Sequence, residues 1–345
     1  MEKKSVLVAM SGGVDSSAAA VLLQRQGYRV DGAMLNLLPG GNDTADARAV
    51  AQRLGMDFHV IDGAGQFAAE VMDRFVSEYC AGRTPNPCID CNRCLKFGLF
   101  LDRALDMGYD YIATGHYARV NYDVAAKQYR LLRGLDRRKD QSYMLYQLTQ
   151  RQLQHLLLPV GEYEKSDIRE NARAAGLANA DKSDSQDICF IPDGEYARFL
   201  REYGGVEMQP GDFVDAEGRA MGRHKGLPCY TTGQRKGLGV AVGRHVYVVR
   251  KNAADNTVVL GDETDLYTDT LTACRVNWIA GAAPEGAVRC TAKTRYSQTE
   301  AEAVAEALPG GRLRLTFGTP QRAVTAGQAV VLYQGEEVLG GGTIE

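Results

Sequence analysis

Cysteines are the most reactive side chains in this sequence, and half of them lie close together. Of the eight cysteines, four fall within 15 residues, at positions 80, 88, 91 and 94. In a reducing compartment such a cluster is more often catalytic, redox-active or metal-binding than structural. Pro85 and Pro87 stiffen the chain before Cys91, and Asn92 can cap a helix that follows. The pattern predicts Cys91 beside a helix N-terminus, which lowers a thiol pKa and favours the reactive thiolate.

A reactive thiol of this kind needs a partner, and Cys189 is the expected one. It lies in a short apolar run after Asp184-Ser185-Gln186-Asp187, 98 residues beyond Cys91. Alone it would be interpreted as a core cysteine, but a polar loop directly before it favours a site. For four other cysteines a buried, inert thiol is the simpler interpretation. They are Cys80, Cys229, Cys274 and Cys290.

A second reactive pattern is the string Ser11-Gly12-Gly13-Val14-Asp15-Ser16-Ser17. It follows an apolar run and opens a helical pattern, at the carboxyl end of an expected strand, where open α/β sheets bind ligands. Glycines let backbone N–H groups turn toward an anion, and the helix N-terminus adds partial positive charge. The alternative is a plain turn in which Asp15 or Ser16 caps the helix. The sequence contains no Gly-x4-Gly-Lys-Ser/Thr motif, so a Walker-type enzyme is not expected.

The string resembles the PP-loop of the ATP pyrophosphatase superfamily. That resemblance implies ATP cleavage between the α and β phosphates, an adenylylated substrate oxygen as intermediate, and AMP as a product. Asp15 would then help to hold Mg²⁺, a cation that prefers carboxylate and phosphate oxygens.

Alternating strand and helix patterns must position these segments. Strands are expected near residues 5–10, 29–35, 58–61 and 111–114, with helices following the first three and another over 92–107. Repeated βα units predict an α/β fold with a doubly wound parallel sheet. Beyond residue 204, β-type runs with glycine turns dominate. We therefore expect a PP-loop ATP-binding catalytic domain at 1–204, a small central domain at 205–265, and an antiparallel C-terminal β-barrel at 266–345.

Composition excludes several classes of protein. Hydrophobic residues make up 45% and charged residues 24%, which is typical of a globular chain. The net charge of −3 provides no global attraction to nucleic acid, so any such partner must be held by local basic patches. The apolar stretches are far shorter than the roughly 20 residues of a membrane span, and the start lacks a secretory pattern. No membrane association and a cytoplasmic location are expected.

Eight strings in order make the sequence similar to the tRNA-specific 2-thiouridylase family. They cover residues 11–17, 82–87, 113–117, 139–143, 184–191, 233–239, 295–296 and 320–328, and Leu339-Gly340-Gly341-Gly342 follows near the end. The resemblance implies that ATP activates the C2 oxygen of the wobble uridine (U34) in certain tRNAs. Sulfur then displaces AMP and leaves 2-thiouridine. A sulfur donor protein, such as a cysteine desulfurase or a sulfur relay protein, is the other implied partner.

The resemblance also implies roles for individual residues. Cys189 would carry the incoming sulfur as a persulfide, and Cys91 would be the nucleophile that resolves it into a disulfide. The implied ATP contacts are Ala9, Met10, Ser11, Gly12, Gly13, Val14, Asp15, Ser16, Leu35 and Gly115. The implied tRNA contacts are Asn86, Pro87, Cys88, His116, Lys139, Asp140, Gln141, Arg295, Tyr296 and Gln328, the first three of them next to the target base.

One departure from the family pattern matters chemically. Many members have aspartate three residues before the nucleophilic cysteine, where this sequence has Cys88. Cys88, Cys91 and Cys189 together offer three thiolates, enough to hold a [4Fe–4S] cluster with one iron open. Zinc on Cys88, Cys91 and Cys94 is another option but would need an outside ligand. The persulfide route and the cluster route both stay open at this stage.

Two other functions compete with thiolation of tRNA. Another PP-loop ligase or amidotransferase acting on a small molecule would share the Ser-Gly-Gly loop, but it would not need a distant cysteine pair. An iron–sulfur or zinc module that only binds RNA would use the cysteines structurally, but it would not need an ATP loop.

Overall fold

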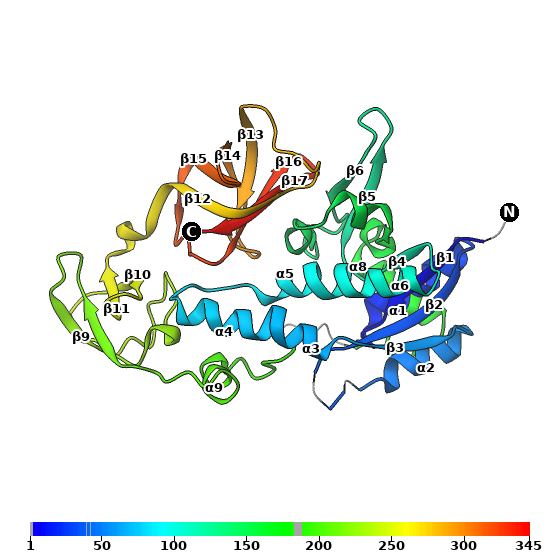
Figure 1. Ribbon diagram of the computed structural model, residues 1–345, viewed down its shortest axis with the longest axis horizontal. Helices are drawn as coiled ribbons and strands as arrows, with labels where there is room; N and C mark the ends of the chain where they lie inside the picture. Colours follow the sequence, from blue (N-terminus) through cyan, green and yellow to red (C-terminus); the bar gives the residue numbers. More distant parts are fainter. Residues whose placement is uncertain (1–2, 39, 42, 183–187) are drawn as a thin grey trace.

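A parallel sheet forms the centre of the N-terminal part of the molecule, at the right of Figure 1. The computed structural model describes residues 3–38, 40–41, 43–182 and 188–345. The strands lie in the order β3-β2-β1-β4-β7, and neighbouring strands are parallel. They are β1 (Ser5–Ala9), β2 (Arg29–Asn36), β3 (Phe58–Asp62), β4 (Tyr111–Ala113) and β7 (Leu156–Leu157). The strands expected from sequence are all present.

Helices cover both faces of this sheet, as the doubly wound prediction requires. Because side chains alternate along a strand, Leu7 of β1 joins one core while Val6 and Val8 join the other. One face is covered by α1 (Val14–Arg25), α2 (Ala45–Leu54) and α8 (Lys165–Ala174). The other is covered by α3 (Ala64–Phe67), η1 (Ala68–Met72), α5 (Pro87–Cys91), η2 (Asn92–Leu99) and α6 (Phe100–Asp106). Helix α4 (Asp73–Cys80) continues from η1, and its buried Phe75 and Tyr79 belong to a separate small core. The α/β fold class is confirmed.

The helix expected over 92–107 begins earlier than the sequence pattern indicated. Segments α5, η2 and α6 follow one another without a break from Pro87 to Asp106, with a π-helical stretch in the middle. Asn86 is the cap, and Pro87 occupies the first helical position, which suits its fixed φ and missing N–H. The prediction that Asn92 caps the helix is therefore wrong.

A small mixed sheet and a closed barrel follow the parallel sheet. The central sheet has the order β10-β11-β8-β9 and the barrel the order β12-β15-β14-β13-β16-β17, closed by pairing of β12 with β17. The central strands are β8 (Gly211–Val214), β9 (Ala220–His224), β10 (Tyr247–Asn252) and β11 (Thr257–Gly261). The barrel strands are β12 (Tyr267–Trp278), β13 (Ala287–Lys293), β14 (Ala301–Leu308), β15 (Arg312–Arg322), β16 (Ala329–Gln334) and β17 (Glu337–Ile344). The C-terminal antiparallel barrel is confirmed, while the boundaries at 204/205 and 265/266 stay predictions.

Shorter elements connect these layers. They are the hairpin β5 (Ala118–Asp123) and β6 (Gln128–Arg133), the helices α7 (Gln150–Gln154) and α9 (Tyr196–Glu202), and the 3₁₀ turns η3 (Ser142–Leu145), η4 (Pro159–Glu162), η5 (Leu227–Cys229) and η6 (Glu263–Leu266). The hairpin lies within the range predicted for the first domain, yet it pairs through β6 with β17 of the barrel. Sequence reasoning missed this connection.

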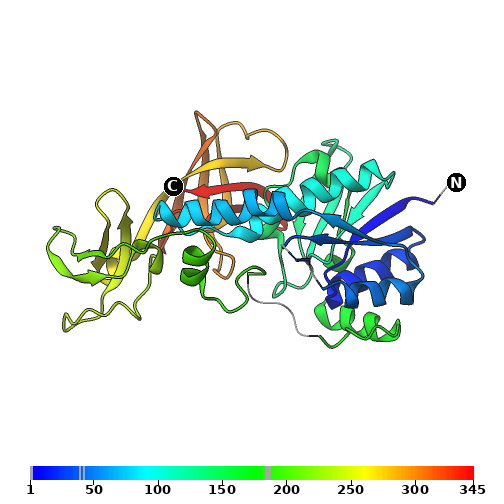
Figure 2. The same cartoon turned by 60° about the horizontal axis from the view of Figure 1, so that its bottom comes forward.

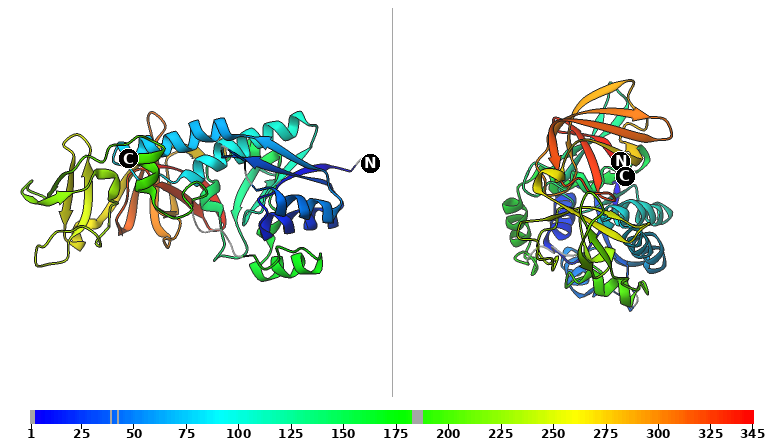
Figure 3. Two further views of the ribbon diagram at one scale, coloured as in Figure 1. Left: turned by 90° about the horizontal axis from the view of Figure 1, so that it is seen from below. Right: turned by 90° about the vertical axis from the view of Figure 1, so that its left-hand side faces the viewer.

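The molecule is elongated, with the parallel sheet at one end and the central sheet at the other (Figures 2 and 3). The barrel lies between them, above the helices α4 and α5–α6 that run along the long axis (Figure 1). This arrangement places the start of α5, which carries Cys88 and Cys91, beneath the barrel and between the outer parts of the molecule.

Candidate active site

The glycine-rich string forms a tight loop between β1 and α1, at the carboxyl edge of the sheet. Strand order reverses at this point, since β1 is flanked by β2 and β4, and such a switch point is a usual ligand site in open α/β sheets. Gly12 has a φ of +74°, a conformation that favours glycine. The hydroxyls of Ser16 and Ser17 donate to the Gly13 carbonyl at 3.2 and 2.9 Å, which fixes the loop. Ser11 remains exposed at its rim.

Gly115 brings the end of β4 against this loop. A Cβ at this position would lie 2.6 Å from the Ser16 nitrogen and 2.7 Å from the Asp15 carbonyl carbon. Both are backbone atoms that cannot give way cheaply, so glycine is required for the close approach. The sequence-predicted residues Gly115, Asp15 and Ser16 are thus brought together.

Three residues that were not predicted from the sequence contact the loop. They are Lys165, Tyr117 and Asn179. Asp15 Oδ1 accepts from the Lys165 ammonium at 2.6 Å and from the Tyr117 hydroxyl at 2.8 Å. The Asn179 side chain donates to the Gly12 carbonyl at 3.0 Å and to the Ser17 hydroxyl at 2.9 Å. Lys165 opens α8, which packs on α1, and it lies 150 positions from Asp15 in sequence. No local pattern could have indicated such a contact.

Of the remaining predicted ATP contacts, most are backbone or buried apolar positions around the loop. Met10 and Val14 are buried, and the Met10 N–H donates to the Ala33 carbonyl of β2 at 2.8 Å. Leu35 lies near the carboxyl end of β2 and is also buried, but it belongs to the core on the opposite face of the sheet from Met10 and Val14.

Cys91 lies inside the helix rather than beside its N-terminus. Asn86 Oδ1 accepts the Cys88 N–H at 3.2 Å, so the helix starts one turn before Cys91. Burial raises the pKa of the Cys91 thiol to about 12, opposed by the Lys96 ammonium and reinforced by the neighbouring thiols of Cys189 and Cys88. The prediction of a lowered Cys91 pKa is therefore wrong, because desolvation outweighs the helix dipole at this depth.

The two cysteines expected to work together do lie together. The thiols of Cys91 and Cys189 interact electrostatically, and so do those of Cys189 and Cys88. Cys189 is exposed and occupies a turn closed by the Ile191 N–H and the Ile188 carbonyl at 2.8 Å. The predicted string at 184–187 lies outside the described residues.

The thiols do not form a metal site in this arrangement. Within the described ranges, no group of three His, Cys, Asp or Glu side chains is placed to hold a metal ion. Cys88 and Cys189 are exposed, whereas Cys91 and Cys94 are buried, and Cys94 is turned toward Glu70 at 3.6 Å. The residues as placed do not fit the [4Fe–4S] cluster or the zinc site considered from sequence, and no chemical step is assigned to either.

The turn after β4 connects the PP-loop to the thiols. Thr114 Oγ1 lies 2.7 Å from His116 Nδ1, and the His116 ring lies 5.6 Å from that of Phe97 in η2. Burial lowers the pKa of His116 well below its usual value, and the Lys96 ammonium lowers it further, so the ring is neutral near pH 7. Gly115 touches the loop on one side while His116 packs on the cysteine-bearing helix on the other.

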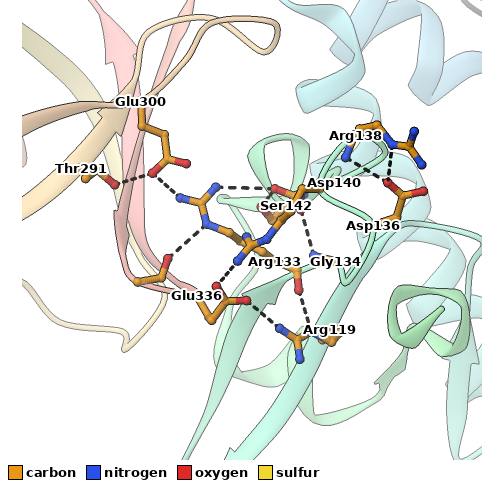
Figure 4. Close-up of polar contacts among 12 residues, drawn as sticks. Arg119, Arg133, Gly134, Asp136, Arg138, Asp140, Ser142, Thr291, Glu300 and Glu336 are labelled. Carbon is orange, nitrogen blue, oxygen red and sulfur yellow. Dashed lines mark hydrogen bonds and ion pairs between the residues drawn. The ribbon is translucent and has the colours of Figure 1, made fainter. Parts of the chain in front are cut away.

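The barrel docks on the catalytic domain through a buried arginine (Figure 4). The Arg133 guanidinium contacts Glu300 at 2.5 Å and Asp140 at 3.7 Å, and it stacks on the Tyr333 ring at 3.6 Å. Asp140 Oδ1 accepts the backbone N–H groups of Gly134 and Ser142, both at 3.0 Å. The basic stretch before residue 140 is thus only partly a solvated loop, because Arg133 is buried while Arg138 is exposed.

A second contact joins the barrel directly to the segment before Cys88. The Gln328 side chain donates to the Thr84 carbonyl at 2.7 Å, and the Thr84 N–H donates to the Ala326 carbonyl at 2.9 Å. Gly327, with a φ of +90°, lies so close that a Cβ would come within 2.8 Å of the Thr84 nitrogen. The barrel therefore sets the position of the chain that leads into the cysteine helix.

Comparison with known proteins decides the family. The model described as tRNA methyl transferase HUP domain matches residues 4–193. The tRNA methyl transferase PRC-barrel domain matches 197–262, and the aminomethyltransferase beta-barrel domain matches 268–344. The tRNA-specific 2-thiouridylase of Acetivibrio thermocellus is 48% identical over 100% of both chains. Those of Carboxydothermus hydrogenoformans and Clostridium beijerinckii are 47% and 48% identical, covering 99% of this chain and 98% and 99% of theirs.

The chain belongs to the tRNA-specific 2-thiouridylase family. Several side chains that the family resemblance assigned to tRNA are engaged within the protein itself. Asp140 faces Arg133, Gln328 binds Thr84, and Gln141 Oε1 accepts the Tyr117 N–H at 3.0 Å. Arg295 donates to the carbonyls of Thr232 and Ala323 and to the Thr325 hydroxyl, at 3.2, 2.8 and 2.6 Å.

The other predicted tRNA contacts of this family member differ in their exposure. Cys88 and Tyr296 are exposed, while Asn86, His116 and Lys139 are half-buried and Pro87 is buried. Lys293, which sequence reasoning missed, lies 5.7 Å from the centre of the Tyr296 ring, a pairing suited to a base and a phosphate. Among the described residues no helix is both long and apolar enough to cross a membrane.

Proposed function

We propose that this protein is an ATP-dependent tRNA 2-thiouridylase. It adenylylates the C2 oxygen of the wobble uridine and replaces that oxygen with sulfur, giving 2-thiouridine, AMP and pyrophosphate. The observation that carries this assignment is the similarity at 48% identity to a tRNA-specific 2-thiouridylase along the whole of both chains. The PP-loop and the paired thiols have the chemistry that this reaction needs.

ATP is proposed to bind across the PP-loop, with its phosphates on the loop N–H groups and the start of α1. The helix end and the glycine backbone attract the phosphate charge, and Ser11 adds a hydroxyl. Asp15 would provide a carboxylate oxygen to Mg²⁺, which would neutralise the leaving pyrophosphate. The Lys165 ammonium and the Tyr117 hydroxyl both contact Asp15 Oδ1, at 2.6 and 2.8 Å, so Oδ2 is the oxygen that would face such an ion. Lys165 would contribute its own positive charge beside the phosphates.

The tRNA is proposed to lie between the barrel and the start of α5. A wobble base must leave its stack before its C2 atom can be reached, and aromatic and basic side chains stabilise such a base. Tyr296 with Lys293 on the barrel, and Cys88 with Asn86 at the helix start, are the proposed contacts. Because the net charge is −3, affinity must depend on local cations and should weaken as salt is added.

Sulfur is proposed to arrive as a persulfide on Cys189 from a cysteine desulfurase or a sulfur relay protein. The exposed position of Cys189 on its turn suits an exchange with another protein. An oxygen is a poor leaving group until it is adenylylated, whereas a persulfide is a strong nucleophile near neutral pH. The nearby thiol of Cys91 would accept the oxidised state as a disulfide.

Reconstitution with defined components tests the assignment. Purified protein, tRNA with an unmodified wobble uridine, ATP and a persulfide donor should give 2-thiouridine, detected by nucleoside mass spectrometry, together with AMP. Cys189→Ser should abolish thiolation and AMP release while tRNA-dependent pyrophosphate release persists, because AMP leaves only when sulfur attacks the adenylylated uridine. Cys229→Ser is the matched control. Formation of ADP, or AMP release on a small amine acceptor without tRNA, would contradict the assignment.

A further inference from the structure

A third thiol lies at the site and has no part in the sulfur transfer described above. Cys88 is exposed at the second position of the cysteine-bearing helix, one turn before Cys91. Residues three apart lie on the same face of a helix, so both thiols point to the same side. They differ in access, because Cys91 is only 7% exposed.

The turn that carries Cys189 is anchored by the neighbouring Phe190. The Phe190 ring packs edge-on against Phe67 of α3 at 5.6 Å and against Phe75 of α4 at 5.5 Å. This anchor fixes the turn 188–191 and leaves Cys189 exposed at its tip. The thiols of Cys88 and Cys189 interact electrostatically, so the two exposed sulfurs share one neighbourhood.

We propose that Cys88 is a further catalytic thiol, the one that first resolves the Cys189 persulfide in this protein. The inference rests on the proposed function. Both thiols on the helix interact with Cys189, but Cys88 is the exposed one, whereas Cys91 is buried. Cys91, in the buried layer beneath, acts after this step.

The transfer has two steps, attack of the persulfide on the uridine and cleavage of the resulting S–S bond by Cys88. The terminal persulfide sulfur attacks C2 of the adenylylated uridine, and AMP leaves with the electron pair of the C2–O bond. The Cys88 thiolate then attacks Cys189 Sγ, its proton passing to solvent. The S–S bond breaks, its electron pair stays on the sulfur bound to C2, and the uracil ring regains a proton at N3. One sulfur is reduced by two electrons, and two thiols become a Cys88–Cys189 disulfide, which a dithiol reductant reopens.

Mapping of the disulfide after one turnover tests the proposal. Protein loaded with persulfide on Cys189 is mixed with tRNA and ATP in the absence of reductant, quenched by alkylation and digested. Trypsin leaves Cys88 and Cys91 on one peptide, residues 84–93, whereas cleavage before Asp90 separates them. The expected cross-link joins the Cys88 peptide to that of Cys189.

Variants give the second readout. Cys88→Ser should lower the single-turnover yield of 2-thiouridine at least about tenfold, because a poorly accessible thiol must replace an accessible one. In Cys91→Ala the Cys88–Cys189 cross-link should still form. Cys80→Ser, which removes an exposed thiol at the end of α4, should match the wild type.

The outcomes separate this proposal from the function on which it rests. A cross-link only between Cys91 and Cys189, with an unchanged yield in Cys88→Ser, overturns the role of Cys88 and leaves thiolation intact. Product without any disulfide overturns it as well. Absence of 2-thiouridine from the wild type, with persulfide loading verified by mass, contradicts the proposed function itself.

Discussion

Lys165 is the residue whose importance the structure reveals most directly. Its side chain is 11% exposed and its ammonium lies 2.6 Å from Asp15 Oδ1, at the first turn of the PP-loop helix. It also lies 5.6 Å from the centre of the Tyr117 ring, which helps to hold it in place. A cation held so close to a phosphate-binding loop can stabilise the charge that develops as pyrophosphate leaves.

Replacing Lys165 with glutamine should therefore slow adenylylation strongly. We expect tRNA-dependent AMP release to fall by about 100-fold or more, a typical loss for one preorganised charge-stabilising group. The control is Lys4→Gln, which removes a Lys–Asp pair of 2.8 Å at the opposite end of β1. An AMP-release rate within about threefold of the wild type, in a variant with unchanged melting temperature, would remove Lys165 from the mechanism.

Asp90, between the two helix cysteines, should make stability depend on pH. Burial raises the pKa of Asp90 from 3.8 to about 6, although Arg74 and Arg93 lower it. The folded state thus holds this proton more tightly than the unfolded chain. The resulting stabilisation is fully present below pH 3.8 and is lost as the pH rises through about 6. At about 1.4 kcal/mol per pKa unit, the loss is about 3 kcal/mol.

Urea unfolding at pH 4 and pH 7 measures this effect. In Asp90→Asn the difference in unfolding free energy between the two pH values should shrink by about this amount relative to the wild type. Asp102→Asn is the control, since Asp102 lies on the same continuous helix but is exposed and pairs with Arg151 at 2.8 Å. Equal pH dependence in the wild type and Asp90→Asn would show that Asp90 ionises normally.

At the scale of elements, the start of the cysteine helix is defined by its cap. Asn86 Oδ1 accepts the Cys88 N–H at 3.2 Å, and Pro87 follows at the first helical position. Loss of such a cap costs about 1 kcal/mol. Asn86→Ala should lower the unfolding free energy by that amount, whereas Asn86→Ser, which can still cap, should retain most of it. Chemical denaturation of the two variants compares them, and equal values would mean that the cap contributes nothing.

Most elements of this fold could be predicted because they rest on local pattern. Strand β1 is an apolar run, α1 follows a glycine turn, and α2 ends at Gly55, whose φ is +65°. The start of the cysteine helix was misplaced because both Asn86 and Asn92 are good caps in sequence. The proline at position 87 decides between them, since it favours the first turn of a helix.

The features that could not be predicted from the sequence depend on contacts between distant segments. Hairpin β5–β6 reads locally as two strands and a turn, but only the barrel edge at Glu337 gives it a partner. The Lys165–Asp15 pair likewise joins residues 150 positions apart. The burial that raises the pKa of Cys91 to about 12 comes from tertiary packing and has no signature in the residues beside it.

At the scale of the whole molecule, the reaction needs three surfaces to be held in a fixed relation. The PP-loop, the thiols and the barrel face with Tyr296 come from separate layers of the chain. The Arg133 contacts, the Gln328–Thr84 hydrogen bond and the packing of Tyr146 against Gly341 hold the barrel to the catalytic domain. At Gly341 a Cβ would lie 2.3 Å from the Val330 carbonyl oxygen of the barrel and 2.8 Å from the Tyr146 ring, so glycine is needed here both for strand packing and for this docking contact.

Replacing Arg133 should therefore impair the tRNA-dependent steps and leave nucleotide binding almost unchanged. Arg133→Gln leaves Glu300 and Asp140 without their cation, a kind of loss that costs about 3–5 kcal/mol. We expect a lower melting temperature, weaker tRNA binding and little change in ATP affinity, measured by calorimetry and filter binding.

Arg314→Gln is the control, since it breaks an exposed Arg–Glu pair of 2.6 Å on the barrel surface, where a pair is worth about 1 kcal/mol or less. Adding Glu300→Gln to Arg133→Gln should restore part of the stability, because the second change removes the uncompensated charge. If the double variant is no more stable than the single one, the charge cluster does not hold the barrel in place, and its docking rests on the hydrogen bonds to Thr84 and on apolar packing.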